Sequence, residues 1–157
     1  MTLTLQSPAF EPNGEIPVVH TCDGRDVSPA LRWSGAPPGT RSFVLIVDDP
    51  DAPDPAAPKR TYVHWVLFDI PADVGNLPEG VATSALPTGT REGLNDWDRV
   101  GYGGPCPPIG RHRYFFKLSA LDTVLGDLGR AKKADVERAM SGHVLAHVEL
   151  VGTYARQ

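Results

Sequence analysis

The chain has little cysteine: Cys22 and Cys106 are the two cysteines among its 157 residues. So few cannot build the disulfide framework of a small secreted domain, and a domain of this length buries enough apolar surface to fold without one. In a reducing cytosol, free thiols are the default state. A bond between the two would require the fold to bring them together, and the sequence spacing leaves that question open.

The sequence also lacks a long apolar run and an excess of positive charge. No segment approaches the ~18 consecutive apolar residues of a membrane-spanning helix, so stable membrane insertion is not expected. Residues 1–10 have neither the basic start nor the apolar segment of a secretory signal, which favours a cytoplasmic location. The formal net charge of −4 argues against nucleic-acid binding, because such binding needs a clustered basic surface.

Glycine and proline are plentiful, with 16 of each, and hydrophobic residues make up 41% of the chain. This composition favours many short elements joined by tight turns, in one domain that spans residues 1–157. Apolar or alternating segments predict strands, and a segment in which charged residues surround a few apolar ones predicts a short helix. The strands are expected at residues 2–5, 42–48, 62–70, 114–118 and 144–150, with possible strands at 16–20 and 30–33, and the helix is expected at 131–140. We therefore expect a mainly β fold, an antiparallel β-sandwich.

The segment 101–118 combines a stiff loop, a polar cluster and an apolar strand. Its glycines let a ligand approach the backbone closely, whereas its prolines fix φ and lack an amide donor. Arg111, His112, Arg113 and Tyr114 then lead into the strand. A polar cluster at the junction of loop and strand indicates the wall of a ligand site, since rigid scaffolds present binding loops in this way. The alternative interpretation is a surface turn that leads into a strand.

Acidic residues and an imidazole accompany two further strands. Asp49 and Asp51 follow one buried strand, and His64 lies within the next, where by itself a core histidine is the simpler interpretation. Buried charge is costly unless it is paired, so an aspartate near a histidine is expected to orient the ring and to favour its charged form. With His112, Tyr114 and the backbone donors of the glycine loop, such a cavity would suit an oxyanion such as phosphate.

Five short segments, spread along the chain, together form a specific pattern. They are TCDG at residues 21–24, SPALRW at 28–33, DPDAP at 49–53, HW at 64–65 and GYGGPCPPIGRHRY at 101–114. These segments resemble the phosphatidylethanolamine-binding protein family, and more narrowly its bacterial Raf kinase inhibitor-like branch. The resemblance covers nearly the whole chain and implies a β-sandwich of two antiparallel sheets, with one or two short helices near the C-terminal part. It also implies a cis peptide bond before Pro53, a minority state of X-Pro bonds.

The resemblance further implies a small pocket for phosphate-like groups, including phosphoethanolamine and phosphotyrosine mimics. The residues that it assigns to ligand binding are Asp49, Asp51, Pro53, His64, Gly103, Gly104, Pro105, His112 and Tyr114. We expect a non-enzymatic protein without metal or cofactor that binds a small phosphorylated or anionic ligand and regulates a protein partner. Bacterial relatives resemble homodimers, a state that the sequence neither supports nor excludes. The spacer at residues 109–111 is shorter than in animal relatives, so the kinase-inhibiting role does not transfer.

Two other chemistries would use the same cluster. In a hydrolase, Cys106 would be the nucleophile and His112 or His64 the base. In a metal centre, Asp49 or Asp51 would join both histidines as a set of two imidazoles and one carboxylate. Both remain alternatives to anion binding.

Three remaining features have simpler interpretations. His143 and His147 are four apart and would pair on a helix, but the alternation at residues 144–150 places them on the outer face of a strand, so zinc is not expected there. Trp97 would form part of a pocket rim if exposed, or pack the loop down if buried. The turn-rich segment 71–100 is either a functional loop, such as a partner-binding or protease-inhibiting one, or contains short strands.

Overall fold

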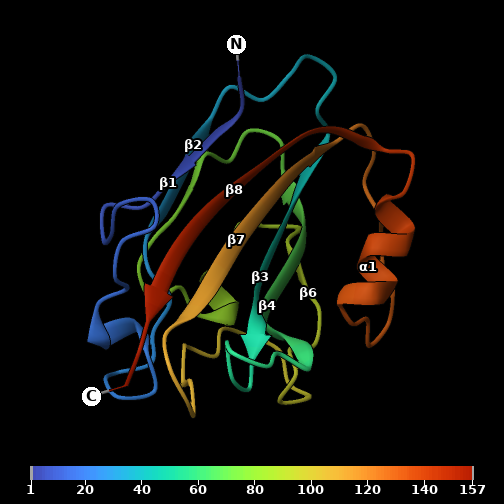
Figure 1. The fold of residues 1–157 in the computed structure, drawn as a ribbon. Helices are drawn as coiled ribbons and strands as arrows, with labels where there is room; N and C mark the ends of the chain where they lie inside the picture. Colours follow the sequence, from blue (N-terminus) through green and yellow to red (C-terminus); the bar gives the residue numbers. More distant parts are fainter. Residues whose placement is uncertain (1, 157) are drawn as a thin grey trace.

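The computed structural model describes residues 2–156, and its strands form two antiparallel sheets (Figure 1). The smaller sheet has the order β1-β2-β5, with β1 at Thr4–Gln6, β2 at Leu31–Ser34 and β5 at Asn76–Leu77. The larger has the order β6-β4-β3-β7-β8, with β6 at Arg91–Glu92, β4 at Arg60–Pro71, β3 at Ser42–Ala52, β7 at His112–Leu121 and β8 at Val144–Tyr154. Helix α1 at Lys133–Met140 lies beside the larger sheet, and 3-10 turns occur at Val18–His20 and Thr83–Ala85. The mainly β fold with two antiparallel sheets is confirmed.

The expected elements have counterparts along the chain. The strands predicted at 42–48, 62–70, 114–118 and 144–150 fall within β3, β4, β7 and β8, those at 2–5 and 30–33 overlap β1 and β2, and the predicted helix contains α1. The possible strand at 16–20 is wrong, because Val18–His20 forms a 3-10 turn. The segment 71–100 contains the short strands β5 and β6, each of which pairs with a longer strand. Within residues 2–156, no helix is long and apolar enough to cross a membrane.

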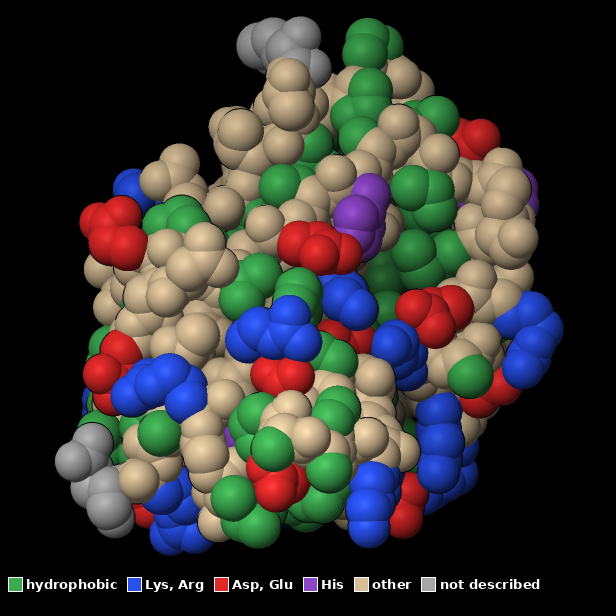
Figure 2. Space-filling view, in the orientation of Figure 1, with side chains coloured by type: hydrophobic (Ala, Val, Ile, Leu, Met, Phe, Trp, Pro, Cys, Tyr) green, Lys and Arg blue, Asp and Glu red, His purple; other side chains and the backbone are tan. Residues whose placement is uncertain are grey.

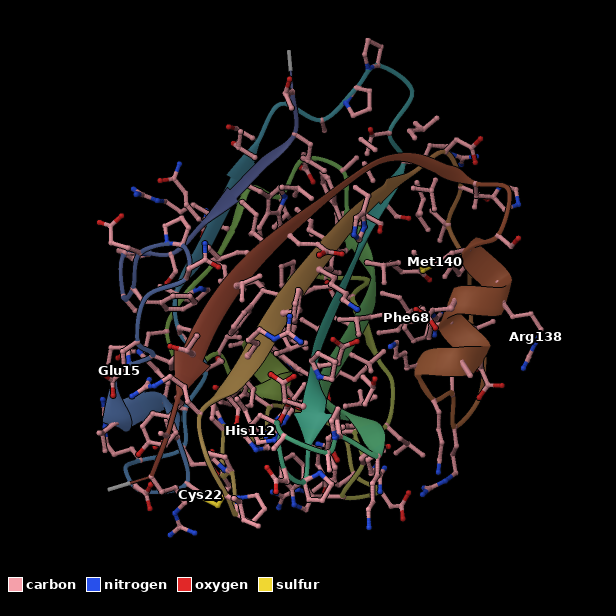
Figure 3. All side chains as sticks on the ribbon, viewed as in Figure 1. Glu15, Cys22, Phe68, His112, Arg138 and Met140 are labelled. Carbon is pink, nitrogen blue, oxygen red and sulfur yellow. A yellow bond between two sulfur atoms is a disulfide. The ribbon has the colours of Figure 1, made fainter. Side chains whose placement is uncertain are left out.

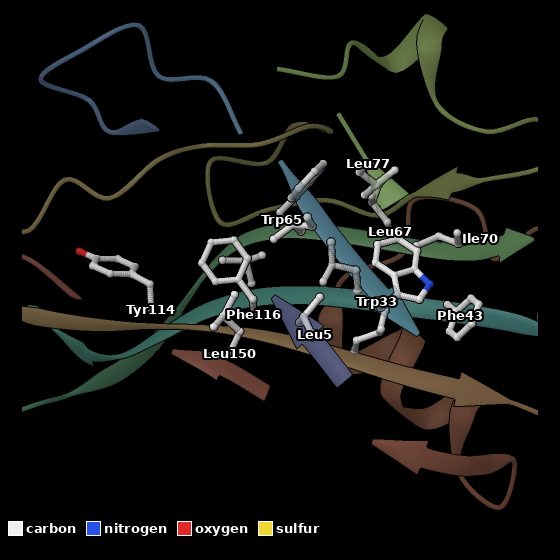
Figure 4. Close-up of a cluster of buried hydrophobic side chains, with 14 of the residues drawn as sticks. Leu5, Trp33, Phe43, Trp65, Leu67, Ile70, Leu77, Tyr114, Phe116 and Leu150 are labelled. Atoms are coloured by element: carbon white, nitrogen blue, oxygen red, sulfur yellow. The ribbon is translucent and has the colours of Figure 1, made fainter. Parts of the chain in front are cut away.

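The main core lies between the two sheets (Figure 4). Leu5 and Trp33 project into it from the smaller sheet, and Phe43, Leu67 and Phe116 project from the larger one. Because side chains alternate along a strand, the sequence neighbours of Phe43, Leu67 and Phe116 point to the outer face of the larger sheet. The outer face therefore needs its own cover.

Helix α1 supplies that cover over part of the outer face. Phe68 of β4 and Met140 of α1 are directed toward one another in Figure 3, and both belong to the cluster that also contains Val44 and Val136. Strand β3 is consequently buried on both faces for most of its length, as its continuous apolar run predicts.

A disulfide joins Cys22 to Cys106, so the expectation of free thiols is wrong for this structure. The fold places the loop after the first 3-10 turn beside the loop before β7, which brings the two Cα atoms to 5.4 Å. The amide of Cys22 also donates to the Pro105 carbonyl at 3.1 Å. Such bonds persist in oxidising compartments, so the structure lends no support to the cytoplasmic location, which stays a prediction.

Candidate functional site

A cavity of about 540 Å³ lies at one end of the core, where β3, β4 and β7 approach one another. Figure 3 labels His112 at this end of β7. Of the predicted ligand-binding residues, the structure places Asp49, Pro53, His64, His112 and Tyr114 on the cavity wall. The other lining residues are Ala52, Lys59, Arg60, Tyr62, Trp97, Cys106, Pro107 and Pro108. The peptide bond before Pro53 is cis, as the family resemblance implies.

Asp49 and His112 form a buried pair on this wall. Asp49 Oδ2 lies 2.5 Å from His112 Nδ1, and Asp49 Oδ1 accepts the amide of Asp51 at 2.7 Å. His112 Nε2 faces the carbonyl oxygens of Ile109, at 2.9 Å, and Pro53, at 3.1 Å. Both ring nitrogens are thus engaged by oxygen atoms of the surrounding loops and of Asp49. The Asp49 carboxyl and the two carbonyls fix the orientation of the His112 ring, as the sequence predicts for an aspartate near a histidine.

His64 is held as a neutral ring. Its Nδ1 donates to the Gly103 carbonyl at 2.7 Å, and the Gly103 amide donates back to the His64 carbonyl at 3.0 Å. Burial lowers the pKa of the His64 imidazole, an effect that the bond to Gly103 only partly opposes. In the neutral form Nε2 therefore has a free lone pair. The ring packs edge-on against Tyr62, Trp97 and Tyr114, with centroid distances of 5.4, 5.2 and 5.3 Å.

Tyr114 contributes a buried hydroxyl that has no hydrogen-bond partner among the described residues. The side chain is 1% exposed and lines the cavity two residues after His112 on the same face of β7. Burial raises the pKa of the Tyr114 phenol, and the nearby Asp49 carboxylate raises it further. The group therefore stays protonated and can donate to a ligand. A buried hydroxyl without a partner costs about 1–3 kcal/mol, which a ligand oxygen would offset.

Asp51 does not line the cavity, although the family resemblance assigns it to the ligand site. Its carboxylate accepts hydrogen bonds from Arg113: the amide at 2.8 Å, Nε at 3.0 Å and Nη2 at 2.9 Å. These bonds from the Arg113 side chain hold the pKa of Asp51 below its usual value, against the opposing effect of burial. The Asp51–Arg113 pair joins the end of β3 to the start of β7 outside the cavity. Asp51 therefore supports the site without lining it.

The glycine loop also lies behind the wall, which corrects the expectation that its amides face an oxyanion. The Gly103 amide is bonded to His64, and the Gly104 amide donates to Asp26 Oδ1 at 2.7 Å. Pro105 uses its carbonyl for Cys22. Gly103 and Gly104 have no room for a side chain: a Cβ on Gly103 would lie 2.1 Å from the Trp97 ring, and a Cβ on Gly104 would lie 2.3 Å from the His20 carbonyl.

The mouth of the cavity contains residues that are not among the ligand-binding residues predicted from the sequence. Lys59, Arg60 and Tyr62 lie there, and Arg60 pairs with Asp96 at 3.0 Å while its guanidinium stacks over the Tyr62 ring at 4.9 Å. The available signal was the position of Tyr62 two residues before His64, since such residues share a face of a strand. Trp97 is 39% exposed and forms part of the rim, as expected of an exposed tryptophan here.

The geometry disfavours both alternative chemistries at this cavity. Cys106 lies in the disulfide, and no free cysteine is found in residues 2–156, so the proposed thiolate nucleophile is not available. Among the same residues, no group of three His, Cys, Asp or Glu side chains is placed to hold a metal ion. Asp51 faces Arg113, and both nitrogens of His112 are engaged in hydrogen bonds. The two histidines and one carboxylate therefore do not converge on a common metal position.

Comparison with known proteins gives consistent matches over nearly the full chain. A UPF0098 protein of Methanothermobacter thermautotrophicus is 48% identical over 98% of this chain and 99% of its own, and one from Aquifex aeolicus is 48% identical over 96% and 86%. Among solved structures, Escherichia coli YbcL, called a new member of the mammalian PEBP family, has a TM-score of 0.90 and 33% identity over 100% of both chains. A candidate PEBP homolog from Chlamydia trachomatis has a TM-score of 0.90 and 38% identity over 99% of both. A family model described as phosphatidylethanolamine-binding protein matches residues 6–155. The chain therefore belongs to the phosphatidylethanolamine-binding protein family.

Proposed function

We propose that the cavity binds the anionic group of a small phosphorylated ligand or peptide and performs no chemistry on it. The observation that carries this proposal is the buried Tyr114 hydroxyl on the cavity wall, which has no partner among the described residues. A phosphate oxygen would accept its proton. Hydrogen bonds to a charged acceptor contribute about 1.5–3 kcal/mol, more than bonds between neutral groups.

The charges around the cavity are compatible with an anion. Asp49 would repel one, but its Oδ2 is engaged by His112 Nδ1 at 2.5 Å and so faces the ring. Lys59 and Arg60 add positive charge at the mouth. His64 Nε2 would accept a hydrogen bond from a protonated phosphate oxygen, or would itself take up a proton and donate.

The remaining walls are apolar and indicate what the anion is attached to. Trp97, Tyr62, Pro107 and Pro108 surround the route from the mouth to Tyr114. Inorganic phosphate would leave these surfaces uncovered, whereas a flat or apolar group bonded to the phosphate would contact them. We infer that a phosphate ester binds more tightly than phosphate itself.

Isothermal titration with phosphate and phosphoethanolamine tests the proposal. The variant Tyr114→Phe removes only the hydroxyl, and we expect affinity to fall by roughly 10- to 100-fold, the loss of about 1.5–3 kcal/mol. Tyr154→Phe is the matched control, because that buried phenol donates to Asp23 at 2.6 Å and does not line the cavity. Equal affinity in wild type and Tyr114→Phe, or no binding by wild type at millimolar ligand, would refute the proposal.

Regulation through a protein partner and homodimer formation belong to this proposal as further predictions. Size-exclusion chromatography with light scattering tests the dimer, and a pull-down with phosphorylated peptides tests the partner. A solved carboxypeptidase Y inhibitor shares the fold at 17% identity with a TM-score of 0.59, which carries no inhibitory role to this chain.

A further inference from the structure

Four polar side chains form a block on the outer face of the larger sheet, opposite the core. Lys117 and Ser119 of β7 pair in register with Glu149 and His147 of β8, respectively. Ser119 Oγ lies 2.9 Å from His147 Nδ1, and His147 Nε2 lies 2.9 Å from Glu149 Oε2. Since a carboxylate only accepts, Nε2 carries the ring proton and Nδ1 accepts the proton of the serine hydroxyl. The result is a hydrogen-bonded relay of serine, histidine and glutamate.

The relay borders a groove of about 360 Å³ between the sheet and α1. Val44, Ile46 and Met140 give the groove an apolar floor, while Ser119 and His147 form a polar wall. Figure 2 shows a hydrophobic hollow on this face with a histidine and an acidic side chain beside it. Ser119 is 4% exposed and the His147 ring is 43% exposed, and both line the groove. The groove is therefore the route by which a substrate would reach Ser119.

We propose that this groove is a second site, in which Ser119 is a nucleophile toward carboxylic esters with a small apolar acyl group. Ser119 Oγ would attack the ester carbonyl while its proton passes to His147 Nδ1. The carbon–oxygen bond to the alcohol would then break, and His147 would return the proton to the departing alcohol. Water would add to the acyl-serine in the same way, releasing the carboxylic acid and restoring the serine. The apolar floor would hold the acyl group, which sets the substrate class.

The electrostatics of the groove set the expected rate. Because β7 is an interior strand between β3 and β8, its backbone amides are committed to the sheet and do not form an oxyanion hole. Among residues 2–156, the groove is lined by one positive side chain, Lys117, whose Nζ is held by Asp48 Oδ2 at 3.1 Å, and by the Glu137 carboxylate. A single ammonium group stabilises a developing oxyanion less than a pair of aligned amides does. We therefore expect slow turnover of activated esters and none of amides.

Hydrolysis of p-nitrophenyl acetate and butyrate, with intact mass measurement of the acylated protein, tests the proposal. We expect one acetyl group on wild type, mapped to Ser119, and at least a tenfold slower release of p-nitrophenol by Ser119→Ala and His147→Gln. His143→Gln is the matched control: His143 is similarly exposed and pairs with Asp122 at 2.8 Å, but no serine hydroxyl lies at its other nitrogen in the described part of the chain. Unchanged rates in Ser119→Ala, or acylation at another residue, would overturn the assignment.

Glu149 is a positioning residue in this scheme, because it acts through His147. Glu149→Gln keeps an acceptor oxygen but removes the charge, and we expect kcat to fall about tenfold with KM unchanged. A purely structural role would leave kcat unaffected in a folded variant. The site shares no lining residue with the anion cavity. Tyr154→Phe, which alters neither site, should therefore hydrolyse the esters at the wild-type rate, and failure of one proposal would leave the other standing.

Discussion

Reduction of the Cys22–Cys106 disulfide should lower the stability of the protein substantially. The two cysteines are 84 residues apart in sequence, so the bond closes a long loop. The chain-entropy model assigns about 4.5 kcal/mol to a loop of this length, and native disulfides typically contribute about 2–5 kcal/mol. At roughly 2–4 °C per kcal/mol for a domain of this size, the melting temperature should fall by about 5–15 °C.

The same reduction should weaken ligand binding, because the disulfide anchors a wall of the cavity. Cys106, Pro107 and Pro108 line that wall, and the prolines have no amide donor to fasten it. Within residues 2–156, no backbone-to-backbone hydrogen bond holds residues 106–110, and the contact of the Ile109 carbonyl with His112 Nε2 is the hydrogen bond that secures them. Loss of the disulfide leaves the wall free to move, so part of the binding free energy is spent on ordering it again.

Thermal unfolding followed by circular dichroism, with and without a phosphine reductant, measures the first effect, and phosphate titration of the same samples measures the second. A Cys22→Ala, Cys106→Ala double variant should behave as the reduced wild type and should not respond to reductant. Melting temperatures that agree within about 2 °C would contradict the reasoning on stability. Equal affinity of oxidised and reduced protein would contradict only the reasoning on the wall.

Two further perturbations test individual contacts. Since burial lowers the pKa of His64, the unfolded chain binds a proton at a pH where the folded chain does not, and stability should fall as the pH drops through the ordinary histidine range. Urea unfolding from about pH 7.5 to about pH 5.5 should therefore show a smaller loss for His64→Phe than for wild type, by up to about 1.4 kcal/mol per pH unit; equal slopes would count against a buried neutral ring. Gly103→Ala should displace the Trp97 ring, shift tryptophan fluorescence and cost about 1–3 kcal/mol, because its Cβ would lie 2.1 Å from that ring. Gly75→Ala, where the nearest atom is 3.3 Å away, should have a much smaller effect, and a similar cost at both positions would refute the packing argument.

The sequence predicts the large sheet well because its strands carry strong local patterns. The continuous apolar run of β3 reflects burial on both faces, and the alternation in β8 reflects one face against the core. The position of the imidazoles and Tyr114 follows from the same patterns, since His112 and Tyr114 are two apart on one strand. The smaller sheet is predicted less completely: segments 2–5 and 30–33 overlap β1 and β2, whereas β5 has two residues and takes its stability from packing on the core rather than from local preference.

The parts of the site that the sequence does not predict depend on irregular backbone and distant contacts. Asp49 and Asp51 should share a face by alternation, but register shifts between Asp49 and Ala52 break the ladder and leave Asp51 facing Arg113. The amides of the glycine loop point toward Asp26 and His64, far away in sequence, instead of toward the cavity. Local composition supplies donors, but long-range packing decides where they point.

The hydrogen-bonded relay of Ser119, His147 and Glu149 cannot be predicted from the sequence either, because it depends on strand register. Alternation correctly places His147 and Glu149 on the outer face of β8, but the residue opposite His147 depends on the pairing with β7. A slip of one residue would turn His147 into the core and bring Ala146 to the outer face, so the inward packing of Ala146, Val148 and Leu150 selects the register. That apolar packing, and not any preference of the polar groups, brings Ser119 to 2.9 Å from the ring. The geometry of the relay is therefore a consequence of the core on the other side of the sheet.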